Sequence, residues 1–128
     1  MTWNDVARTT FAALTTYKKD GTPVTTPVWV APDGDRIVIW TMTGTWKVKR
    51  IRRNPAVTLQ ACDGRGRIRG EEVITGAARI LDADGTEHVR RVVARKYGVI
   101  GTLAIKAHKL FRGAHRSVGI AVVPDAPA

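Results

Sequence analysis

The sequence predicts a mainly β protein, a small closed or half-closed barrel with helices at its periphery. Six segments carry the β-branched and aromatic residues typical of strands. The first three segments follow one another through tight turns, so they are expected to be antiparallel. Short helical patterns lie between later strands rather than regularly alternating with them, which favours a barrel over a doubly wound sheet. The 128 residues suffice for one domain, and we place no boundary within 1–128.

The first three predicted strands are residues 11–18, 23–31 and 36–41. Turn residues rich in Asp and Gly separate them. Pro27 lies inside the second strand and has no N–H to donate to a ladder. This strand is therefore expected to lie at an edge, to be bulged, or to be open to a ligand at that point. The third strand is apolar enough to be buried on both faces.

A change of period predicts a short helix over residues 46–54. Val48 and Ile51 are three apart and form a thin apolar stripe among five cations. The helix is expected to end at Asn54, because the following Pro55 disfavours helical backbone there. Residues 56–62 then alternate apolar and polar side chains, which predicts a fourth strand.

A loop rich in glycine and arginine follows over residues 64–70, here called the arginine loop. Its glycines do not have the spacing of a dinucleotide-binding turn or a P-loop. It either closes over an anionic ligand or is a plain flexible hairpin. Residues 71–81 predict a longer strand, and Gly76 within it predicts a bulge.

The last third of the chain predicts helix and then a final strand. A helix capped by Asp84 or Thr86 is expected to run through Tyr97 and to stop at Gly98. A second apolar stripe with helical spacing covers residues 103–111. The closing segment, residues 117–123, has the composition of a strand.

Charge is the unusual property of this composition. Lys and Arg number 21 against 11 acids, a net charge of +10. The cations gather in residues 44–70 and 86–116, each with eight basic residues and one acid. Nucleic acid, an anionic membrane surface or a phosphate-bearing small molecule are the partners that such a charge favours.

The same sequence argues against a membrane span, a signal peptide and an internal disulfide. No apolar run reaches the roughly 18 residues that span a bilayer, and the first residues do not resemble a signal peptide. The single cysteine, Cys62, rules out an internal disulfide. A cytoplasmic location is therefore expected.

A compact anion site is one interpretation of the segment that enters the short helix. Thr45 precedes the helix, and Lys47 and Arg50 share one of its faces. The alternative is a solvated basic helix that Thr45 merely caps. Trp29 and Trp40 likewise either contact a flat heterocycle or pack in the core.

The side chains themselves offer little chemistry. His88, His108 and His115 are not spaced as metal ligands, and Cys62 has no evident catalytic partner. We assign no catalytic side chain and no metal site. If the protein is an enzyme, a cofactor is expected to carry the reaction.

Five segments of the chain together carry a family resemblance. They are TTYKKDGTPVTTPVWV, IVIWT, TWKVKRIRRNPAVTLQACDGRGRIRG, RKYG and SVGIAVV. These segments resemble the pyridoxamine 5'-phosphate oxidase-like family. The resemblance implies a split β-barrel of the FMN-binding-protein type. More narrowly, the chain is similar to small members of the flavin/deazaflavin oxidoreductase B type, classed as coenzyme F420-dependent oxidoreductases. It implies a homodimer with two cofactor sites at the subunit interface.

The resemblance also implies which residues bind the cofactor. The phosphate motif falls on Thr45, Trp46 and Lys47, with a large Trp46 where relatives have a small residue. Arg50 would assist. We further infer that Lys49, Arg52, Arg53 and the arginine loop attract the polyglutamate tail of F420. The full set of expected cofactor-binding residues is Thr26, Pro27, Val28, Trp29, Trp40, Thr41, Thr45, Lys47, Lys49 and Arg50.

The leading hypothesis is an F420H2-dependent oxidoreductase that passes a hydride to a small unsaturated, quinone-like or tetrapyrrole-like acceptor. The nearest alternative is an FMN-dependent oxidase or reductase on the same fold. A non-catalytic cofactor or haem carrier is a further alternative. Nucleic-acid binding is disfavoured, because the cations lie in helices and loops rather than between aromatic residues on a strand face.

Overall fold

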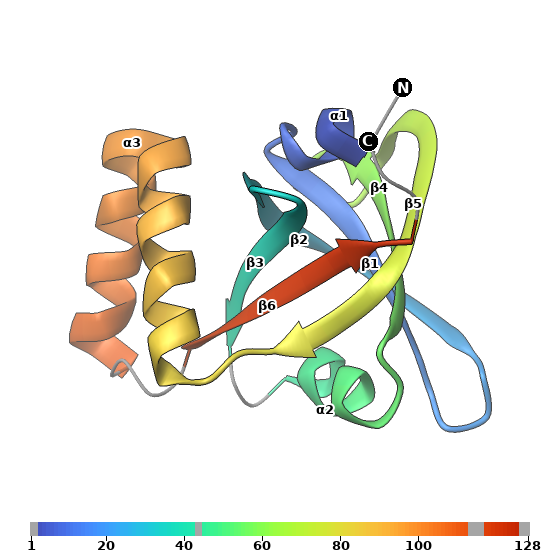
Figure 1. Cartoon of the computed structure of the whole chain (residues 1–128). Helices are drawn as coiled ribbons and strands as arrows, with labels where there is room; N and C mark the ends of the chain where they lie inside the picture. The colour runs from blue at the N-terminus through green and yellow to red at the C-terminus, as the bar shows by residue number, and fades with distance from the viewer. Residues whose placement is uncertain (1–2, 43–44, 113–116, 126–128) are drawn as a thin grey trace.

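Six antiparallel strands close into a barrel in the computed structural model (Figure 1). This arrangement confirms the predicted fold class. The order around the barrel is β1-β2-β3-β6-β5-β4. The strands are β1 (Phe11–Tyr17), β2 (Pro23–Asp33), β3 (Arg36–Met42), β4 (Ala56–Cys62), β5 (Ile68–Ile80) and β6 (Ser117–Pro124).

Three helices lie outside the barrel: α1 (Trp3–Ala7), α2 (Trp46–Arg53) and α3 (Ala83–Arg112). Figure 1 shows α2 at one end of the barrel, α1 near the other end and α3 along the side. The structure describes residues 3–42, 45–112 and 117–125, with the backbone alone for residues 3–4 and 99–112. Over this part of the chain, no helix combines the length and the apolar composition needed to cross a bilayer.

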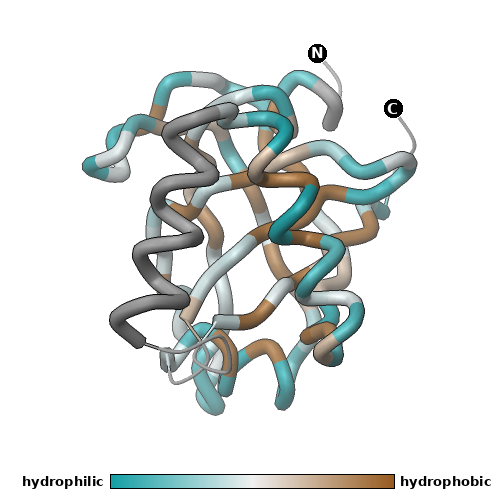
Figure 2. Tube along the Cα trace, turned by 90° about the vertical axis from the view of Figure 1, so that its left-hand side faces the viewer, coloured by the Kyte–Doolittle hydropathy of each residue, from teal (hydrophilic) through white to brown (hydrophobic). Residues whose placement is uncertain are grey.

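The barrel interior is filled by one face of each strand. Figure 2 shows hydrophobic residues along the strands and hydrophilic ones at the hairpin ends. The largest interior side chains without solvent exposure are Leu14, Val30, Ile37, Ile39, Leu59 and Ile120. The predicted stripe on α2, Val48 and Ile51, is also buried, so the helix is held by packing rather than by its own propensity.

A second apolar layer joins α3 to the outside of the barrel. Val89, Val92 and Val93 pack against Ala31 and Val38. The third strand is therefore buried on both faces, as predicted. Gly98 interrupts α3 with φ 61° and ψ −135°, which confirms the expected stop. The second helical stripe also lies on α3, but its side chains fall outside the described residues.

Gly76 has a different role from the predicted bulge. The register is regular there, with Val57 opposite Gly76, and the irregularity lies instead opposite Gln60 and Cys62. A Cβ at Gly76 would lie 2.6 Å from the backbone oxygen of Val123. Glycine is required because β6 approaches closely, not because a residue is inserted.

The pairing between β2 and β3 covers only part of each strand. These strands pair only from Val30 opposite Ile39 to Asp33 opposite Arg36. Before that point, residues 23–29 of β2 pair with β1 alone, and residues 40–42 of β3 pair with β6 alone. One backbone edge of β2 is thus unpaired around Pro27, which confirms the predicted strand edge.

Candidate cofactor site

A cleft of about 440 Å³ lies where β2 and β3 separate. Its walls come from β1, β2, β3 and the first turn of α2. They are mainly aromatic and aliphatic, with a single ammonium group. The lining residues are Phe11, Pro27, Val28, Trp29, Trp40, Thr41, Met42 and Lys47. A concave apolar site with few polar groups is the usual form of a cofactor pocket.

Lys47 supplies the charge of the cleft. It is half-buried, and no carboxylate pairs with it among the described residues. Burial, and then the neighbouring charge of Arg50, lower the pKa of Lys47 from its usual 10.5. The first turn of α2 contains no acidic residue. An anion placed here would meet both the ammonium and the free amides of the helix start.

Thr45 is the residue at the N-cap of α2, but its side chain does not cap the helix. Its hydroxyl instead donates to the backbone oxygen of Met42 at 3.0 Å. The hydroxyl therefore ties the helix start to the end of β3. The amides at the start of α2 have no side-chain acceptor from Thr45, so they stay available to a ligand.

Of the other predicted cations of α2, Lys49, Arg50 and Arg53 lie in a second hollow, of about 510 Å³, whereas Arg52 lines neither this hollow nor the cleft. The second hollow adjoins the cleft through α2 and is here called the basic groove. Its lining residues are Lys18, Lys19, Trp46, Lys49, Arg50 and Arg53. Trp46 is 70% exposed, and the Lys49 Nζ lies 4.5 Å from its ring centroid, within cation–π range.

Arg50 is fixed in the basic groove by β1. Its Nε donates to the Thr16 hydroxyl at 2.6 Å, and the Arg53 guanidinium donates to the Tyr17 carbonyl at 3.3 Å. Arg50 and Lys49 are therefore brought together beside the cleft, whereas Lys47 lies in it. Thr26 is next to Pro27 in β2 and, like Thr45, lines neither hollow.

Sequence reasoning missed several lining residues. Phe11 and Met42 reach the cleft, and Lys18 and Lys19 reach the basic groove. Phe11 is opposite Trp29 in the β1–β2 register, and its ring lies 6.3 Å from the Trp29 ring, edge-on. The hairpin turn after the first strand was the available signal, since it fixes this register.

The wall at Trp29 is supported from behind by α3. The Tyr97 ring lies 4.8 Å from the Trp29 ring. The Tyr97 hydroxyl is 2.7 Å from the carbonyls of both Thr10 and Val30, and burial raises its pKa to about 12. The position of Trp29 is thus set by contacts with Tyr97, a residue that is distant in the sequence and lies on α3.

Lys96 reinforces this support. Its ammonium donates to the carbonyls of Ala7, Thr9 and Val30. Burial lowers the pKa of Lys96 to about 8. One side chain thus links α3 to the α1–β1 connection and to β2 at the point where the cleft begins.

The sequence over residues 4–120 matches the family described as pyridoxamine 5'-phosphate oxidase. The chain belongs to this family. The expected resemblance to the pyridoxamine 5'-phosphate oxidase-like split barrels is thereby confirmed, and the family includes oxidoreductases. No curated protein matches the chain.

Three solved structures illustrate the shared fold. A conserved hypothetical protein from Mycobacterium tuberculosis has a TM-score of 0.71 at 20% identity, covering 99% of this chain and 82% of that one. An F420 reductase has a TM-score of 0.64 at 20% identity, covering 98% and 94%. The haem storage protein HutZ from Vibrio cholerae has a TM-score of 0.70 at 11% identity, covering 97% and 88%. All three share the fold of this chain, and the two whose names mention a bound group name different ones, F420 and haem.

Proposed function

We propose that this family member is an F420-dependent oxidoreductase whose cofactor site is the cleft between β2 and β3. The observation that carries the proposal is the unpaired backbone edge of β2 beside an apolar cleft with Lys47 at one end. When bound, reduced F420 supplies a hydride and a proton, and an acceptor gains both. The chain's own residues bind and orient the cofactor and shield it from water.

The residues present fit the parts of such a cofactor. The free edge of β2 from Pro27 to Trp29 offers backbone groups to the polar rim of a flat ring, and Trp40 and Thr41 form the facing wall. Lys47 and the start of α2 suit the phosphate. The lowered pKa of Lys47 means that its charge is poorly solvated in the free protein, so a phosphate oxygen would compensate it.

The basic groove favours F420 over FMN. Both cofactors carry a phosphate, but only F420 continues into a polyglutamate tail. The groove adjoins the phosphate position through α2 and gathers Lys18, Lys19, Lys49, Arg50 and Arg53. None of these cations forms an ion pair with a carboxylate in the described part of the chain. A group of cations of this kind attracts a polyanion such as the polyglutamate tail.

We also propose a homodimer in the cytoplasm, with each cofactor site completed by the second subunit. The cleft is an open surface feature of one chain, so a partner would supply its missing wall. Cys62 is free and buried, in keeping with a reducing compartment. The acceptor is a small molecule that stacks on the open face of the ring.

Titration of the purified protein with F420 and with FMN, followed by tryptophan fluorescence, tests the proposal. We expect saturable quenching by F420 and weaker binding of FMN, because Trp29 and Trp40 line the cleft. A quinone should then oxidise bound F420H2. Tight FMN binding without F420 binding would instead assign the flavin alternative, and cofactor binding without turnover would assign a carrier.

A further inference from the structure

The arginine loop lies against the wall of the cleft. A Cβ at Gly64 would lie 3.3 Å from the Phe11 ring, and one at Gly66 would lie 3.8 Å from the Pro27 ring. Both rings line the cleft. Arg65 stands between these two glycines in the chain. The loop backbone therefore packs on two cleft residues, one on each side of Arg65 in the chain.

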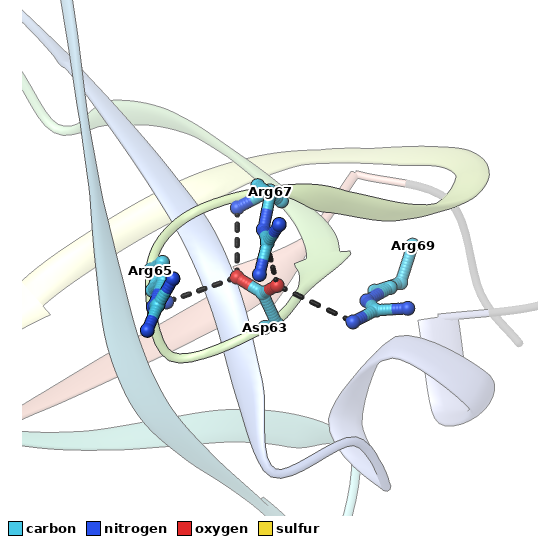
Figure 3. Close-up of polar contacts among 4 residues, drawn as sticks. All are labelled: Asp63, Arg65, Arg67 and Arg69. Atoms are coloured by element: carbon cyan, nitrogen blue, oxygen red, sulfur yellow. Dashed lines mark hydrogen bonds and ion pairs between the residues drawn. The ribbon is translucent and has the colours of Figure 1, made fainter.

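A single carboxylate shapes this loop (Figure 3). The Asp63 Oδ1 accepts the backbone N–H groups of Arg65 and Arg67, each at 2.9 Å. The Oδ2 accepts from the Arg67 Nε at 3.0 Å and the Arg69 guanidinium at 3.3 Å. These contacts, led by the Arg67 backbone hydrogen bond, lower the pKa of Asp63. The carboxylate thus stays ionised and holds the turn.

Arg65 differs from its two neighbours. Figure 3 shows its side chain on the other side of Asp63 from Arg69. Only its backbone contacts Asp63, and its exposed guanidinium has no ion pair within the described residues. The loop that packs on the cleft wall therefore carries one guanidinium without an ion pair among the described residues.

The loop and the basic groove lie at opposite ends of β1. Phe11, at the start of β1, contacts the loop, whereas Thr16 and Tyr17, at its end, hold Arg50 and Arg53. Seven residues of strand span about 20 Å at roughly 3.3 Å each. A phosphate at Lys47 with a tail in the basic groove leaves Arg65 without a partner. The arginine loop, which the sequence suggested for the polyglutamate tail, is then free to bind a second anion.

We infer that the acceptor is a flat unsaturated molecule bearing a carboxylate, and that Arg65 binds this carboxylate at the cleft rim. The inference rests on the proposed function for the ring site. One free guanidinium matches the single charge of a carboxylate, and its planar fork pairs with both oxygens. The apolar rings of Phe11 and Pro27 beside it suit the body of such a molecule.

The test compares a naphthoquinone carrying a carboxylate side chain with its methyl ester. Binding is measured by tryptophan quenching, with and without F420, and reduction is measured with F420H2. We expect wild type to bind the acid about tenfold more tightly than the ester, the scale of one charge-assisted hydrogen bond. Arg65→Gln should abolish this preference and Arg65→Lys should keep part of it. Arg79→Gln, an exposed arginine on β5, is the matched control.

Equal binding of acid and ester by wild type would overturn the inference, as would an unchanged preference in Arg65→Gln. Because binding is also measured without F420, the result does not depend on turnover. A protein that binds F420 and reduces both quinones equally would refute the carboxylate site and leave the proposed function intact. A protein that does not bind F420 yet prefers the acid through Arg65 would refute the proposed function and leave the carboxylate site intact.

Discussion

Lys47 is the residue on which the proposed cofactor site depends most directly. Its ammonium is half-buried and close to Arg50, and each circumstance disfavours its charge. A ligand phosphate reverses both effects by supplying the missing counter-charge. The positive charge of Lys47, which lacks a counter-charge in the free protein, is therefore expected to favour the binding of an anion.

Replacement of Lys47 by alanine should weaken F420 binding by about 1–3 kcal/mol, the range for a hydrogen bond to a charged group. Fluorescence titration measures the change. Arg52→Ala is the matched control, because Arg52 is an exposed cation of α2 that lines neither the cleft nor the basic groove. Equal losses of F420 affinity in the two variants would mean that Lys47 contributes only to the overall positive charge and does not contact the phosphate.

The affinity for F420 should fall as the pH rises into the alkaline range. Lys47 in the free protein loses its proton below the usual 10.5, whereas a bound phosphate favours the protonated form. Between the free and the bound pKa, affinity should drop about tenfold per pH unit. Below the free pKa it should be flat. Binding measured as a function of pH shows this, and Lys47→Arg, which stays charged, should remove the decline.

At the scale of elements, α3 holds β2 in position. Tyr97 supports the Trp29 ring, and Lys96 joins three carbonyls from two separate segments. These contacts act at the point where β2 leaves β3. The shape of the cleft is thus controlled by a helix that is not part of its lining.

Lys96→Met should lower the free energy of unfolding by about 2–3 kcal/mol, since it leaves buried carbonyls without their charged donor. Denaturation by urea measures the loss. Arg95→Met, on an exposed neighbouring position of α3, is the control and should change little. If both variants are equally stable, Lys96 does not link these elements.

Most elements were predictable, because local patterns encode them, but the short helix α1 was not expected. The alternation in residues 56–62 and the Val48–Ile51 stripe each identified a correct element. The role of Gly76 was not predictable, since it depends on the approach of β6 from elsewhere in the chain. The same holds for the site. Lys47 and the open edge at Pro27 followed from local residues, whereas Phe11 enters the cleft through strand register.

For the whole molecule, the proposal that a partner completes the open cleft makes the number of subunits a functional property. The outer surface of β5 and β6 exposes Val73 and Val123, at 49% and 55%. Apolar side chains this exposed on a sheet are candidates for a contact between subunits. A second chain against that surface would bury them.

Sedimentation should therefore give a particle of twice the chain mass of 14.0 kDa. Val123→Glu should shift it toward the monomer and weaken F420 binding together, if the partner completes the site. Ala83→Glu, which places the same charge on an exposed residue at the start of α3, should leave the dimer intact. A monomer that binds F420 fully would show that one chain forms the whole site.

The break between β2 and β3 has a further consequence, for how the molecule avoids assembling with itself. An unpaired strand edge is a template on which another chain can add a strand. Two of the seven residues along this edge are prolines, Pro23 and Pro27, and neither has an N–H to offer. The edge is therefore interrupted as a template while its remaining backbone groups stay open to a small ligand. The same short run of sequence thus serves the proposed recognition of a cofactor and limits aggregation through the strand edge.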